Sequence, residues 1–141
     1  MKKEGAVIVD IGGESTRPGS KTVPTQKEIQ RIIPVIDLIK SKSKSSLISV
    51  DTRKSIVAEK ALETGASMVN DISAGSFDKK MFEVVAKHRA GICLMHSQGL
   101  PENMQNKPQY DEILLDLYDY FQEKIAEAQS KGCLLYTSPS P

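Results

Sequence analysis

The feature that most constrains the fold is an alternation of short apolar runs with longer segments of helical periodicity. The apolar runs cover residues 6–9, 47–50, 67–69 and 91–95. They are short and rich in β-branched residues, which is typical of strands buried on both faces of a parallel sheet. Each run leads into a polar residue: Asp10, Asp51, Asn70 followed by Asp71, and His96.

Helical periodicity fills the intervals between these runs. Apolar residues recur there at three- and four-residue spacing, over about 25–39, 53–64, 78–89 and 110–128. Thr25 and Glu28 have the spacing of a capping box, which predicts the start of the first helix. The predicted order is βαβαβαβα, and this order requires a parallel sheet with right-handed crossovers.

Two α/β architectures fit this order: an open doubly wound sheet and a (β/α)8 TIM barrel. An open nucleotide-binding sheet usually carries G-x-G-x-x-G after its first strand, whereas residues 12–14 read Gly-Gly-Glu. A polar residue at the end of every strand favours the barrel, which distributes its active site over those ends. Because a complete barrel takes about 250 residues, a chain of 141 residues is expected to hold about four βα units.

Composition and charge exclude several classes of partner. Hydrophobic residues make up 39% of the chain and charged residues 26%, with 19 basic and 18 acidic side chains and a net charge of +1. This balance gives no field that would favour nucleic acid or an anionic membrane. No apolar run reaches the roughly 20 residues of a membrane helix, and the two cysteines have no metal-type spacing. A cytoplasmic protein is expected.

Residues 8–20, which read Ile-Val-Asp-Ile-Gly-Gly-Glu-Ser-Thr-Arg-Pro-Gly-Ser, resemble the second-strand signature of the dihydropteroate synthases. Residues 49–52, 69–73 and 94–96 are similar to the third-, fourth- and fifth-strand motifs of that family, in the same order. The resemblance implies a partial pterin-binding TIM barrel, strands 2–5, over residues 1–132. Residues 133–141 look like a tail outside the family and are expected to be irregular.

The resemblance implies an activity in folate biosynthesis. The family condenses 6-hydroxymethyl-7,8-dihydropterin diphosphate with p-aminobenzoate to give 7,8-dihydropteroate, with Mg²⁺ assisting the departure of diphosphate. Two alternatives stay open: a methyltetrahydrofolate-type pterin methyltransferase, which shares the barrel, and a non-catalytic half-barrel that binds pterin. Four strands of an eight-stranded barrel leave two unpaired edges, so this chain alone is expected to self-associate and to be inactive.

Four residues are predicted to bind the pterin, as the motifs align. Asp51 offers two acceptor oxygens for ring N–H groups, and Asn70 offers both a donor and an acceptor. Ile72 and Met95 are predicted as apolar walls of the pocket. The alternatives are a helix N-cap for Asp51, a buried amide that braces loops for Asn70, and ordinary barrel core for Ile72 and Met95.

The loop after the first strand is predicted to act on the leaving group. In the family, the pair matched by Thr16 and Arg17 contacts diphosphate and the p-aminobenzoate region, and the guanidinium fork suits phosphate oxygens. Pro18 and Gly19 complete the predicted substrate-binding loop as a turn. On composition alone, an ordinary surface turn with a solvated arginine explains the same residues.

Further expectations concern support, metal and partners. His96 is predicted as a supporting packing residue rather than a general base, and Asp10 as possible support. No metal ligand is predicted in this chain, although the resemblance implies Mg²⁺ for the family. It also implies small-molecule substrates, a homodimer, and a sulfonamide target, with neither nucleic acid nor membrane as a partner.

Overall fold

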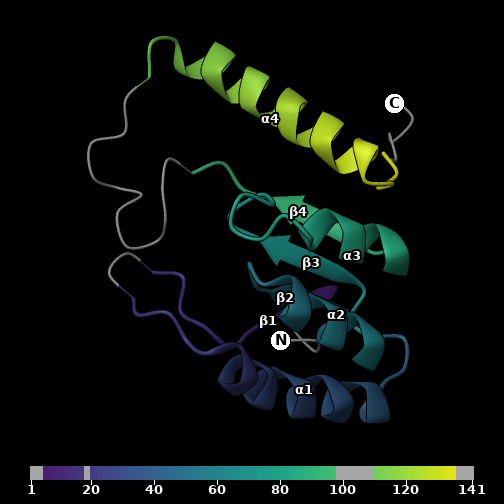
Figure 1. The fold of residues 1–141 in the computed structure, drawn as a ribbon. Helices are drawn as coiled ribbons and strands as arrows, with labels where there is room; N and C mark the ends of the chain where they lie inside the picture. The colour runs from purple at the N-terminus through teal and green to yellow at the C-terminus, as the bar shows by residue number, and fades with distance from the viewer. Residues whose placement is uncertain (1–4, 18–19, 98–109, 136–141) are drawn as a thin grey trace.

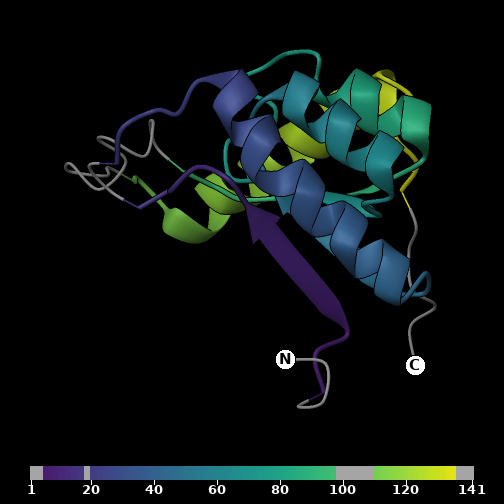
Figure 2. The same cartoon turned by 90° about the horizontal axis from the view of Figure 1, so that it is seen from below.

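The computed structural model describes residues 5–17, 20–97 and 110–135, and within these ranges strands and helices alternate in the predicted order. The elements are β1 (Ile8–Gly12), α1 (Thr25–Lys42), β2 (Leu47–Asp51), α2 (Ser55–Thr64), β3 (Met68–Asp71), α3 (Met81–His88), β4 (Gly91–Leu94) and α4 (Ile113–Ser130). The strands form one parallel sheet in the order β1-β2-β3-β4. Helices α1, α2 and α3 lie side by side on one face of it, and α4 lies beyond β4 (Figures 1 and 2).

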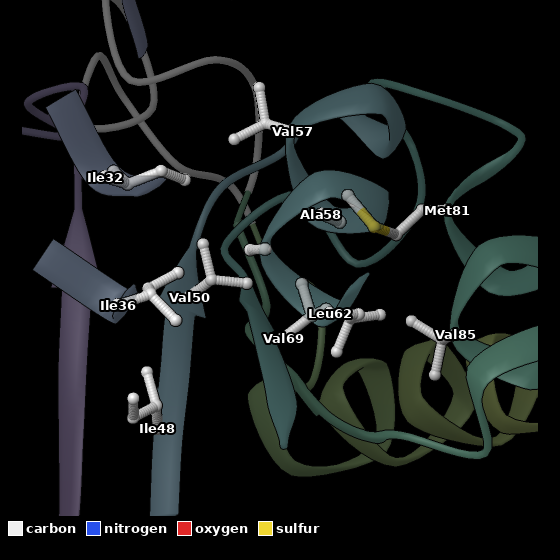
Figure 3. Packing of buried hydrophobic residues seen from close by; sticks show 11 residues of the cluster. Ile32, Ile36, Ile48, Val50, Val57, Ala58, Leu62, Val69, Met81 and Val85 are labelled. Atoms are coloured by element: carbon white, nitrogen blue, oxygen red, sulfur yellow. The ribbon is translucent and has the colours of Figure 1, made fainter. Parts of the chain in front are cut away.

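One face of the sheet forms the hydrophobic core together with the helices. Residues paired across neighbouring strands lie on the same face, and one such row is Ile11, Val50, Val69 and Ile92. Val50 and Val69 are fully buried, in one cluster with residues of all three covering helices (Figure 3). Burying one such side chain contributes about 1.5–3 kcal/mol, so this layer dominates the stability of the fold.

The opposite face of the sheet is polar at the carboxyl ends of the strands. The register places Gly12, Asp51, Asn70 and Cys93 in one row across all four strands. Alternation along each strand directs this row away from the helices. In a closed barrel this face is the interior, and its carboxyl end is where ligands bind.

Two local predictions are wrong. Asp10 does not end the first strand, because pairing with β2 continues to Gly12, which lies opposite Asp51. The predicted capping box is absent as well: α1 follows Pro24 without a side-chain cap, and Glu28 is only 1% exposed. The Glu28 carboxylate instead accepts a hydrogen bond from the Thr52 hydroxyl at 2.7 Å.

Helix α4 buries only part of its predicted apolar stripe. Ala128 is buried, whereas Ile113 and Leu114 are each more than half exposed. Cys133, just beyond α4, packs against the core cluster, while residues 136–141 lie outside the described residues. In the part of the chain that the structure describes, no helix is long and apolar enough to cross a membrane.

Candidate functional site

Asp51 is the centre of the polar row at the carboxyl edge of the sheet. It ends β2, between Gly12 on one side and Asn70 on the other. A Cβ added at Gly12 would lie 3.4 Å from Oδ2 of Asp51, so the glycine keeps space beside this carboxylate. Oδ1 of Asp51 is buried and has no hydrogen-bond partner among the described residues. A buried acceptor without a partner is costly, and a ligand that donates N–H groups would satisfy it.

The surroundings of Asp51 disfavour its charged form. Burial raises the pKa of this carboxyl from 3.8 to about 6, and the charges of Asp10, Glu28, Asp71 and Glu14 act in the same direction. A ligand that donates hydrogen bonds to the carboxylate would stabilise the charged form and lower the pKa again. The site therefore suits a ligand whose edge donates N–H hydrogen bonds rather than an anionic ligand.

The structure does not support helix capping by Asp51. The first backbone N–H of α2, at Ser55, donates to Oδ2 of Asp78 at 2.8 Å. The preceding N–H, at Lys54, donates to the hydroxyl of Thr52 at 3.3 Å. The side chains of Asp78 and Thr52 therefore accept these hydrogen bonds, and Asp51 is not needed as a helix cap.

Asn70 and Asp10 meet across β2. Nδ2 of Asn70 donates to Oδ2 of Asp10 at 3.2 Å, although the two residues are 60 positions apart in the sequence. Asp10 precedes Gly12 by two residues, so it lies on the same face of the sheet, and it is paired with Ser49. The predicted pterin-binding amide and the predicted supporting carboxylate are thus in contact.

The loop after β1 carries Thr16 and Arg17 and leaves the sheet at the same edge. Thr16 is half-buried and Arg17 exposed, and within the described ranges neither side chain forms a hydrogen bond or an ion pair. Pro18 and Gly19, also predicted to belong to the site, lie outside the described residues.

A buried charge network beside the site was not predicted from the sequence. Nζ of Lys54 contacts Oε2 of Glu14 at 2.7 Å, Oε2 of Glu28 at 2.6 Å and the carbonyl oxygen of Val23 at 2.8 Å. These groups come from the loop after β1, from the first turn of α1 and from the segment after β2. The network therefore joins three segments that frame the carboxyl edge.

Arg53 extends this network. Its Nε contacts Oε1 of Glu14 at 3.1 Å, its Nη2 donates to the hydroxyl of Thr22 at 3.3 Å, and its guanidinium lies 4.3 Å from the ring centre of Phe77. Arg53 is only 5% exposed. The one available sequence signal was the occurrence of opposite charges just after two neighbouring strands, at position 14 and at positions 53–54.

The remaining predicted residues follow β3 and β4. Ile72 and Met95 are both half-buried, which suits pocket walls and barrel core equally. The His96 ring lies 4.6 Å from the ring of Tyr120 in an edge-on arrangement, and the Tyr120 hydroxyl donates to the carbonyl oxygen of Met95 at 3.3 Å. This aromatic packing agrees with a supporting role for His96.

Metal-ligating side chains gather away from the carboxyl edge. In the described ranges, the one group of three consists of Glu59, Glu63 and His88, on α2 and α3. Each carboxylate is already paired with a lysine, at 2.7 Å in both cases. The described residues around Asp51 do not form a cluster fit to hold Mg²⁺, so no step of the chemistry below is assigned to that ion.

The two glycines that follow Ile11 are expected to respond differently to alanine substitution. A Cβ at Gly13 would lie 2.9 Å from Cγ of Glu28 and 3.0 Å from its backbone oxygen, so Gly13→Ala is expected to destabilise the fold by about 1–3 kcal/mol. Gly12→Ala meets only ordinary contacts at Asp51 and is expected to keep the fold while weakening ligand binding. Urea denaturation and ligand titration of both variants test this pair; equal stability losses would contradict it.

The fold is half of a (β/α)8 barrel with Asp51 and Asn70 at its carboxyl edge, and comparison with known proteins agrees with this fold. The family model for pterin binding enzymes matches residues 1–134. The chain therefore belongs to the pterin binding enzyme family.

Individual relatives include dihydropteroate synthases. The enzyme of Synechocystis is 41% identical over 134 residues, which are 95% of this chain and 46% of that protein. A solved Yersinia pestis dihydropteroate synthase with a sulfonamide drug superposes with a TM-score of 0.88 at 37% identity, over 94% of this chain and 48% of the other. The Clostridium difficile enzyme, solved in the presence of pteroic acid, gives 0.86 at 40% identity, over the same shares. The predicted partial barrel is confirmed, and the chain spans about half the length of these relatives.

Proposed function

We propose that this chain provides the pterin-binding half of a dihydropteroate synthase active site. The observation that carries the proposal is the buried Oδ1 of Asp51, which has no partner among the described residues and lies next to Asn70 in the row at the carboxyl edge. A pterin presents adjacent N–H donors and a carbonyl acceptor on one edge, which a carboxylate and an amide can match together. The family match and the dihydropteroate synthase relatives support the same assignment.

The proposed reaction needs positioning rather than a protein nucleophile. The amine of p-aminobenzoate attacks the exocyclic methylene carbon of the pterin, the bond from that carbon to the diphosphate oxygen breaks, and the amine loses a proton. Asp51 and Asn70 would fix the pterin ring, and Arg17 would stabilise charge on the departing diphosphate.

Binding can be tested on the 141-residue chain itself, because Cys93 reports on the site. Cys93 is exposed and paired in register with Asn70, whereas Cys133 is half-buried and burial raises its pKa. We expect 6-hydroxymethyl-7,8-dihydropterin diphosphate to protect Cys93 from alkylation and to leave the slower reaction of Cys133 unchanged. We expect binding without turnover, since the chain spans about half the length of its dihydropteroate synthase relatives.

The same measurement distinguishes the alternatives. Protection by methyltetrahydrofolate at concentrations where the pterin diphosphate gives none would favour a pterin methyltransferase. Equal labelling of Cys93 with and without every pterin would contradict a pterin site at this edge. The homodimer, the cytoplasmic location and the requirement for Mg²⁺ stay predictions from the family resemblance.

A further inference from the structure

We propose that Lys54 is a positioning residue: it anchors the base of the loop that carries Thr16 and Arg17 to the strand end that carries Asp51. The described residues of this loop, 14–17 and 20–23, are called the diphosphate loop. The role of its residues toward diphosphate rests on the proposed function, whereas the anchoring itself rests on the contacts of Lys54.

Lys54 holds both ends of the diphosphate loop at once. Its ammonium has three N–H donors, and these reach Glu14 at one end of the loop, Val23 at the other, and Glu28 in α1. Lys54 is 8% exposed, so the contacts are shielded from water and are worth more than surface pairs. An ammonium with all three donors used has one orientation.

The two ends of the loop are also bonded to each other. The backbone N–H of Val23 donates to Oε2 of Glu14 at 2.6 Å, the same oxygen that Lys54 contacts. Nearer the middle of the loop the hydrogen bonds among the described residues are local, such as Ser20 N–H to the Arg17 carbonyl at 3.1 Å, and the longer-range bond from Arg53 reaches Thr22, next to the base. The position of Arg17 relative to the sheet is therefore set at the base of the loop.

The anchor is continuous with the pterin site. Lys54 follows Asp51 by three residues, and Thr52 between them donates to Glu28, which also accepts from Lys54. The four buried charges Glu14, Glu28, Arg53 and Lys54 balance in number. A displacement of Lys54 would therefore change the position of the diphosphate loop relative to Asp51. The pterin-binding residues on β2 and β3 would stay in place.

Glu14→Gln tests the anchor without removing Lys54. The variant keeps the pair between Lys54 and Glu28 and removes only the charge at the base of the loop, so the fold is expected to persist. Glu63→Gln is the matched control, because Glu63 forms an exposed ion pair with Lys60 at 2.7 Å on α2. The readouts are hydrogen exchange of the Val23 amide and titration with the pterin diphosphate and with the pterin alcohol that lacks diphosphate.

In Glu14→Gln the Val23 amide is expected to exchange about tenfold faster, which is the size of effect one charge-assisted hydrogen bond produces. Affinity for the pterin diphosphate is expected to fall about tenfold, and affinity for the pterin alcohol by less than about twofold, with no change in Glu63→Gln. Unchanged exchange at Val23 would overturn the anchoring. Equal loss of affinity for both ligands would overturn the positioning role. A wild-type chain that binds neither pterin contradicts the proposed function, and the exchange result then still decides the anchoring.

Discussion

Asp51→Asn is expected to abolish pterin binding, with a loss of affinity of about 100-fold or more. The carboxylate can accept two hydrogen bonds from the N–H groups of the pterin edge, whereas an amide offers one acceptor and places an NH₂ donor against a donor. Isothermal titration with the pterin diphosphate measures the loss. An affinity within about threefold of that of the wild type would show that the pterin is not hydrogen-bonded to this carboxylate.

The same substitution is expected to stabilise the fold at neutral pH. Because burial and neighbouring carboxylates raise the pKa of Asp51 from 3.8 to about 6, the folded state disfavours its charged form. The penalty is absent below about pH 4 and complete above about pH 6. Asparagine carries no charge and so removes this penalty. The free energy of unfolding is therefore expected to rise by about 1–2 kcal/mol at pH 7.5, a figure reduced to allow for the partial exposure of the side chain, and to change little at pH 4.

These opposite effects separate function from folding. A variant that merely damaged the structure would lose both affinity and stability, whereas Asp51→Asn is predicted to lose the first and gain the second. Urea denaturation at pH 7.5 and pH 4 measures the stability arm. A destabilised variant at pH 7.5 would mean that Asp51 has a structural partner and is not held for a ligand.

Lys54→Ala is expected to destabilise the chain by about 3–5 kcal/mol, because it leaves the buried carboxylate of Glu28 without a cation and that of Glu14 with Arg53 alone. Glu14 and Glu28 both contact Nζ of this lysine, at 2.7 and 2.6 Å. Lys60→Ala is the control, since its ion pair with Glu63 is exposed to solvent and is expected to contribute little to stability. Similar effects of the two substitutions would contradict a buried network.

The effect of Lys54→Ala is also expected to depend on pH. Burial alone would raise the pKa of Glu14, but the hydrogen bonds from Lys54 and Val23 and the nearby charges of Lys54 and Arg53 outweigh it and hold the pKa below 4.5. A lowered carboxyl pKa contributes stability above the ordinary value, and this contribution is lost as the pH falls through the lowered value. The difference between wild type and Lys54→Ala should therefore shrink below pH 4.5.

The sequence was sufficient to predict the sheet, because short β-branched runs alternate along the chain with longer segments of helical periodicity. The row of Val50 and Val69 against the helices follows from short β-branched runs, and the row of Asp51 and Asn70 follows from polar residues that end those runs. Both rows depend on local pattern and on the rule that paired residues share a face. The motif resemblance added which ligand such a row would bind.

Long-range partners could not be predicted in the same way. Glu28 has the spacing of a capping residue, yet its partners Thr52 and Lys54 lie 24 and 26 positions away, so the tertiary contact overrides the local signal. The end of β1 was misplaced for a related reason: pairing with β2, not the polarity of Asp10, decides where the strand ends. The partners of Lys54 can be identified only when the fold and the strand register are known.

The central claim is that this half-barrel binds a pterin at the row of Gly12, Asp51, Asn70 and Cys93. Backbone amide chemical shifts of the ¹⁵N-labelled chain, recorded during titration with 6-hydroxymethyl-7,8-dihydropterin diphosphate, test it most directly. The predicted result is saturable shifts at these four residues and at the nearby diphosphate loop. No shifts of comparable size are expected in the groove between α3 and α4, at Val85 and Ile125. Shifts confined to that groove, or no saturable shifts at all, would contradict the claim.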